Sequence, residues 1–179
     1  MKKLLLILLF IPLVSFGQLF DCKVSDGFIL VNKDWVDKTS FYDDAKKTTN
    51  WSDENIRSII NQLVTNDNTF YIDINNFDNI VVILKSKVEP SNSILKTLES
   101  GILKNAKEWG MEILVWETGL KLYNNKHKYI YIVNKSRIKK INLDNWSNQY
   151  IISINNKTYW MTINSVNGLT IEDVFLEIN

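Results

Sequence analysis

A helical pattern followed by several strand patterns is the feature that most constrains the fold of this chain. In residues 91–110, SNSILKTLESGILKNAKEWG, apolar side chains recur every three or four positions, and Ser91 and Gly110 are typical of a helix start and end. β-Branched, apolar and aromatic residues then dominate the segments 112–123, 127–136 and 149–165. The order predicts one long helix followed by a meander of antiparallel strands.

The remaining periodic segments place helices at both ends of this pattern. Residues 51–64 repeat apolar side chains at helical spacing, residues 77–89 have the composition of a buried strand, and residues 170–179 predict a short closing helix. Asn155, Asn156 and Lys157 separate two strand patterns, and asparagine tolerates the positive φ of a tight hairpin turn. The expected fold class is α+β, an antiparallel meander covered by helices.

The first 17 residues have the order of a cleaved secretory signal. Lys2 and Lys3 precede an apolar run, and Ser15-Phe16-Gly17 provides the small-residue exit. A spanning helix needs about 20 apolar residues, so a permanent anchor is the weaker interpretation, and bulky residues before Cys22 argue against lipid attachment. Ser-Phe-Gly-Gln also resembles the signal endings of Bacteroidota. We expect a cleaved signal (1–17), a flexible segment (18–27), one domain (28–179), and a periplasmic or secreted location.

Composition narrows the partners and the chemistry of the mature chain. The full chain has 179 residues, 45% of them hydrophobic, which suits one folded domain. Its 21 basic and 20 acidic residues become 19 and 20 without Lys2 and Lys3, a net charge of −1 that argues against nucleic acid as a partner. No nucleotide-binding glycine motif is present, and one cysteine and one histidine cannot build a usual zinc site. No cofactor and no metal are expected.

The element order also carries a family resemblance. FILVNKDW (28–35), the helix 91–109, the strands around Ile113 and Tyr131, the hairpin 150–165 and the closing TIEDVFLEIN resemble the PsbP-like α/β/α sandwich family. The resemblance implies helices on both faces of the sheet and a non-catalytic role in binding or assembly. It transfers no ligand residue, and residues 38–68 depart from the family pattern.

Three polar features have ordinary structural interpretations. His127 lies in NNKHKY, where we expect a solvated turn, and Cys22 is expected in the flexible N-terminal segment, although an intermolecular disulfide is the alternative. DINNFDN (73–79) has calcium-like oxygen spacing but lacks the central glycine and distal glutamate of an EF-hand loop. A turn between strands is the preferred interpretation of DINNFDN.

Two groups of residues are candidate sites. In the segment 33–51, rings beside carboxylates could bind a sugar or a cationic group; its tentative ligand residues are Trp35, Phe41, Tyr42, Asp43, Asp44 and Trp51. The alternative is that the rings fill the edge of the core. In NKSRIKK (134–140), alternating cations on a strand could meet an anionic surface or protect a sheet edge; the tentative basic residues are Lys135, Arg137, Lys139 and Lys140.

Two functional hypotheses follow from these candidates. The favoured one is an exported, non-enzymatic binding or assembly factor of the bacterial cell envelope, which recognises a protein or an envelope component and has no transmembrane helix after signal cleavage. The alternative is a small hydrolase that acts on glycan or peptide with carboxylates of the segment 33–51. The positions of those carboxylates relative to each other distinguish the two hypotheses.

Overall fold

The structure of the protein is a computed structural model, and strands are its main elements. It describes residues 20–31, 69–139 and 142–179, together with 40, 42–43, 46, 52–54, 57–58 and 61. Of the residues described, 55% are in strands and 23% are helical.

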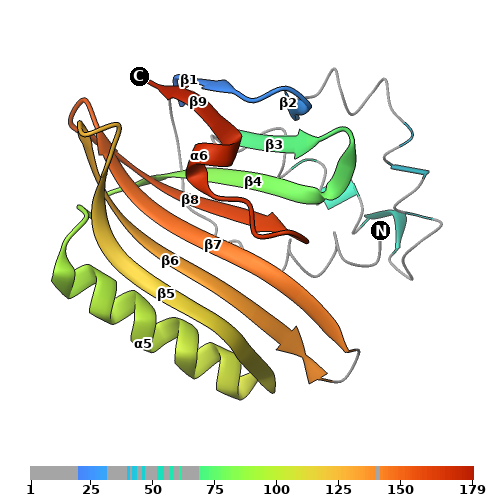
Figure 1. Ribbon diagram of the computed structural model, residues 1–179. Coiled ribbons are helices and arrows are strands. Elements are labelled where there is room, and N and C mark those ends of the chain that lie inside the picture. The colour runs from blue at the N-terminus through green and yellow to red at the C-terminus, as the bar shows by residue number, and fades with distance from the viewer. Residues whose placement is uncertain are drawn as a thin grey trace.

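Seven antiparallel strands form the main sheet (Figure 1). Their order across the sheet is β2 (Phe28–Leu30), β3 (Thr69–Asp73), β4 (Asn76–Ser86), β8 (Lys157–Ser165), β7 (Leu143–Ile154), β6 (His127–Ile138) and β5 (Met111–Tyr123). Strands β5 to β8 are consecutive neighbours, so the predicted meander is confirmed. β4 pairs with β8. The next strand along the chain after β4 is β5, which lies at the far edge of the sheet.

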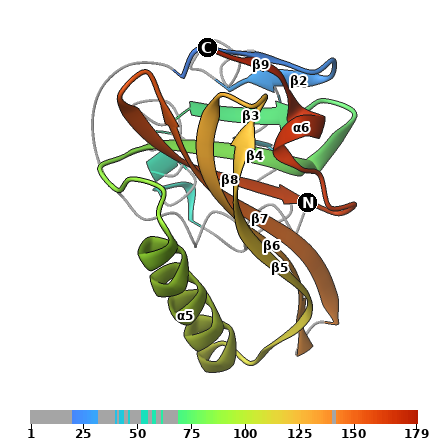
Figure 2. The ribbon, with the colours of Figure 1, turned by 60° about the vertical axis from the view of Figure 1, so that its left-hand side comes forward.

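Different layers cover the two faces of this sheet. Helix α5 (Asn92–Glu108) packs on one face beside β5 and β6. The other face carries the short helix α6 (Ile171–Val174) and a two-stranded sheet of β1 (Cys22–Val24) and β9 (Phe175–Ile178). Figure 2 shows α5 at the end of the molecule away from β9. One long helix and a strand pair therefore provide most of the described cover.

The face under β9 and α6 has an aromatic core. Tyr129, Tyr131 and Tyr150 point to this face because residues two apart on a strand share a side. The phenol of Tyr123 donates a hydrogen bond of 2.9 Å to the carbonyl of Phe175, and that of Tyr150 accepts one of 3.2 Å from the amide of Ile171. The aromatic face thus fixes the closing segment by packing and by hydrogen bonds.

The helix predicted for residues 91–110 is confirmed as α5. The Ser91 hydroxyl accepts a hydrogen bond from the amide of Ile94, and Gly110 has the positive φ of 64° that ends the helix. Leu95 packs with Ile130, Ile132 and Ile151 on the sheet. Capping and helical periodicity therefore identified α5 correctly.

The asparagine hairpin is also confirmed. Asn155 and Asn156 connect β7 and β8 with φ values of 48° and 62°. Two consecutive positive φ values are typical of the type I′ turn, whose twist matches that of a hairpin. This short turn sets the register that aligns Ile152 with Tyr159 in the core.

The predicted α/β/α sandwich is wrong. The described chain is mostly strand, and helices do not cover the sheet on both sides. The spacing of residues 171–178 predicted a closing helix, but the helix is one turn long, and Phe175–Ile178 is a strand paired with β1. A pairing partner about 150 residues away along the sequence overrides the local spacing here.

The N-terminal part of the described chain differs from the expected flexible segment. Within residues 20–27, Phe20 is buried against Tyr159 and Phe175, and β1 pairs with β9. The proposed signal (1–17) lies outside the described residues, as does most of the predicted helix 51–64. Of the helices that the structure describes, none combines the length and the hydropathy needed to cross a membrane.

Candidate functional site

A charged and aromatic part of the sheet lies beyond the layer formed by α6 and β9. We call this surface the open face; its residues are Glu112 and Val115 of β5, Val133, Lys135 and Arg137 of β6, and Asp144 and Trp146 of β7. The strand register places them on the same side as the aromatic core. All seven are exposed or half-buried, and Figure 1 shows the strands extending past α6. Within the part of the chain that the structure describes, the open face is therefore a surface of paired strands with accessible side chains.

An ion-pair network organises the centre of the open face. The Arg137 guanidinium contacts both carboxylate oxygens of Asp144, with Nε–Oδ1 at 2.7 Å and Nη2–Oδ2 at 3.2 Å. The Lys135 Nζ also lies 3.2 Å from Asp144 Oδ2. The Arg137 hydrogen bond, assisted by Lys135, lowers the pKa of Asp144 to about 2. Asp144 is therefore ionised at physiological pH, and it orients both cations.

Trp146 borders this network. Its ring centroid lies 5.9 Å from the Lys135 ammonium, and its strand position is directly opposite Lys135. Gly168 packs against the indole so closely that a Cβ there would lie 3.1 Å from ring atoms. The loop before α6 therefore holds Trp146 in place beside the charges.

The predicted basic surface is brought together only in part. Lys135 and Arg137 share one side of β6, whereas Lys139 is exposed after the strand and Lys140 lies outside the described residues. Asp144 binds both β6 cations, so this surface has no uniform positive charge. Arg137 and Asp144 are seven residues apart on either side of a hairpin turn, a spacing that can place them opposite each other. The sequence interpretation missed this pattern.

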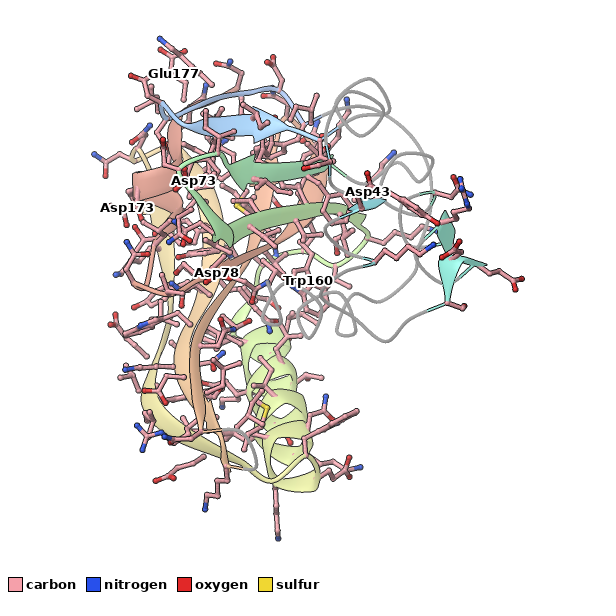
Figure 3. The ribbon with its side chains drawn as sticks, turned by 90° about the vertical axis from the view of Figure 1, so that its right-hand side faces the viewer. Asp43, Asp73, Asp78, Trp160, Asp173 and Glu177 are labelled. Carbon is pink, nitrogen blue, oxygen red and sulfur yellow. The ribbon has the colours of Figure 1, made fainter. Side chains whose placement is uncertain are left out.

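The predicted aromatic and acidic site falls largely outside the described chain, with Trp35, Phe41, Asp44 and Trp51 all beyond it. Of its remaining residues, Tyr42 is half-buried with the Arg57 guanidinium 4.8 Å from its ring centroid. Asp43 is exposed, and Figure 3 shows it well apart from Asp73 and Asp173. The described part of this segment therefore gives no carboxylate pair that would favour a hydrolase.

His127 is buried, and Cys22 is half-buried against the aromatic core. The predicted solvated turn for His127 is wrong, because only 6% of the residue is exposed. Burial, followed by the charge of Lys126, lowers its pKa. The Cys22 thiol lies 3.3 Å from the hydroxyl of Tyr71, and burial raises its pKa. A thiol with a raised pKa is a poor nucleophile at neutral pH.

The turn interpretation of DINNFDN is confirmed. One carboxylate oxygen of Asp73 accepts a hydrogen bond of 2.9 Å from the amide of Asn75, and the other accepts one of 3.0 Å from the side chain of Asn79. Within the ranges that the structure describes, no three His, Cys, Asp or Glu side chains come together as metal ligands. The hydrogen bonds of Asp73 serve the β3–β4 turn.

No protein-family model matches this chain, and no curated protein is significantly similar to it in sequence. The geometry of the open face is accordingly the basis for a functional assignment.

Proposed function

We propose that this chain is an exported, non-enzymatic protein of the bacterial cell envelope that binds another protein or an envelope component through the open face. The observation that carries the proposal is the half-exposed network of Lys135, Arg137 and Asp144 beside Trp146. Its export is proposed from the signal-like residues 1–17.

The composition of the open face supports a protein as the partner. Arginine and tryptophan are enriched at the energetic centres of protein interfaces, where they combine apolar contact with hydrogen bonding. Two cations (Lys135 and Arg137) balance two carboxylates (Glu112 and Asp144). A balanced surface suits a partner of mixed charge better than a polyanion, because a polyanion requires an excess of positive charge.

The geometry of the open face also favours binding, because its charged side chains are already restrained before a partner binds. The cations arise from a strand paired on both sides, and Asp144 restrains their side chains before any partner arrives. Side chains that are already ordered lose less conformational entropy on association. The open face is therefore a preorganised surface.

Affinity capture with matched variants tests the proposal. The wild-type protein, Lys135→Ala and Lys96→Ala serve as baits in envelope extract of the producing bacterium. Lys96 is exposed on α5 and lies away from the open face. Lys135→Ala leaves the Arg137–Asp144 pair in place, so the fold is retained.

We expect one specific component to be recovered with the wild type and with Lys96→Ala, and to be about tenfold less abundant with Lys135→Ala, which corresponds to the loss of one interface charge. Equal recovery by all three baits, or no specific component with any of them, contradicts binding through the open face.

A further inference from the structure

We propose that two copies of this chain pair through the outer edge of β5 and form one continuous antiparallel sheet. β5 is the last strand of the main sheet, and among the described strands only β6 pairs with it. Alternate residues of this 13-residue strand direct backbone donors and acceptors to the outer edge, where no described strand pairs with them. This inference goes beyond the proposed function: Val115 belongs to both surfaces, but the ion pairs of Lys135, Arg137 and Asp144 lie on β6 and β7, away from the outer edge of β5.

Exposed apolar side chains are concentrated at this edge. Leu122 of β5 is 54% exposed, and Leu103 of α5 is 46% exposed. The side of α5 that carries Leu103 lies over β5, because Glu99, one turn earlier, accepts a hydrogen bond from Thr118. Strand pairing at this edge would bring Leu122 toward apolar side chains of a second copy.

The regular part of β5 is centred on a glycine. A bulge interrupts the register between Ile113 and Val115, which leaves Val115–Tyr123 as an uninterrupted segment with Gly119 at its midpoint. When two identical strands pair around a two-fold axis, the residue at the axis lies opposite itself. An axis at Gly119 therefore pairs the whole segment with its equivalent in the second copy.

The charges of β5 are complementary in this register. Lys121 lies opposite Glu117 of the second copy, and the symmetry repeats the contact. Leu122 lies opposite Trp116 of the second copy in the same way, on the α5 side of the sheet. An axis at Glu117 or at Lys121 would instead place like charges opposite each other, which destabilises a strand pair. The charges thus select the register centred on Gly119.

Tyr131 explains why glycine stands at this position. A Cβ on Gly119 would lie 2.8 Å from the Tyr131 ring, so the ring fills the side-chain space. The Tyr131 hydroxyl donates a hydrogen bond of 3.1 Å to Glu117, and the Lys121 ammonium lies 4.4 Å from the ring centroid. Both charged side chains remain more than half exposed. They are held on one side of the sheet and are still accessible to a second copy.

Charge reversal with rescue tests the pairing. Sedimentation velocity measures the dimer dissociation constant of the wild type, Glu117→Lys, Lys121→Glu and the double exchange. We expect each single reversal to raise that constant about tenfold, because symmetry applies the change twice, and the double exchange to restore it. Reversal of Lys104 or Glu108, an exposed pair on α5, is the matched control and should leave it unchanged.

A disulfide experiment tests the register directly. In a Cys22→Ser background, a Glu117→Cys protein is mixed with a Lys121→Cys protein under oxidising conditions. Directly opposed residues on paired strands are close enough for a disulfide. We expect cross-linked dimers from the mixture and far fewer from either protein alone.

Three results would overturn the proposal. The first is a wild type that stays monomeric at about 100 µM, a concentration well above the dissociation constants of specific homodimers. The others are a dimer whose dissociation constant does not change with either charge reversal, and a mixture that does not cross-link. Capture of an unrelated extended peptide by β5, with no self-association, would also reject the second copy as the occupant.

Discussion

Removal of one buried hydroxyl should weaken the attachment of the closing segment to the aromatic face. The Tyr150 hydroxyl accepts a hydrogen bond from the amide of Ile171, the first residue of α6, and both residues are buried. An amide in the first turn of a helix has no partner within the helix. Tyr150→Phe keeps the ring but leaves this buried donor without its acceptor, which costs about 1–3 kcal/mol.

Tyr131→Phe is the matched control for this prediction. Its hydroxyl donates to Glu117, whose carboxylate is well exposed and can bond to water instead. The expected loss is about 0.5–1 kcal/mol. Urea denaturation followed by circular dichroism gives both free energies of unfolding. An equal or larger loss for Tyr131→Phe would refute the role assigned to the Tyr150 hydroxyl.

Two further stability predictions follow from the structure. His127 is buried and its pKa is lowered, so the unfolded chain binds a proton at a higher pH than the folded chain does. The contribution of neutral His127 to the free energy of unfolding is therefore complete above about pH 6.5, the pKa of an unfolded histidine. As pH falls toward the folded-state pKa, this contribution decreases by at most about 1.4 kcal/mol per pH unit. His127→Gln should remove this pH dependence. A difference in free energy of unfolding between the wild type and His127→Gln that stays constant between about pH 7.5 and 5 would contradict the prediction. Asn156→Ala should lower the free energy of unfolding, measured by urea denaturation, by about 1–2 kcal/mol, because the φ of this residue is 62°. Asn156→Gly should leave it nearly unchanged, because glycine adopts positive φ without strain. Equal losses for the two variants would show that the turn conformation is not the cause.

Local chemistry explains which elements could be predicted from the sequence. The periodicity and caps of α5 lie within 20 residues, and the turn at Asn155 and Asn156 depends on the residues that form it. Elements of this kind carry their own instructions, because a cap or a positive φ is satisfied by neighbours in the chain.

Long-range pairing explains what could not be predicted. Phe175–Ile178 becomes a strand because β1 lies beside it, and His127 becomes buried because its hairpin packs near Ile178. The open face depends on where the cover of the sheet ends, which no local pattern states. The charges of Lys135 and Arg137 were recognised, but their shared partner Asp144 emerged only from the register of β6 and β7.

Site-specific photo-crosslinking in the producing cell tests the central claim most directly. A photoreactive amino acid replaces Glu112, an exposed residue of the open face that lies outside the ion-pair network, or Lys96 on α5, and irradiated adducts are identified by mass spectrometry. Binding through the open face predicts a discrete adduct with another envelope component from position 112 and none from position 96. The same adducts from both positions, or none from position 112, would contradict the claim.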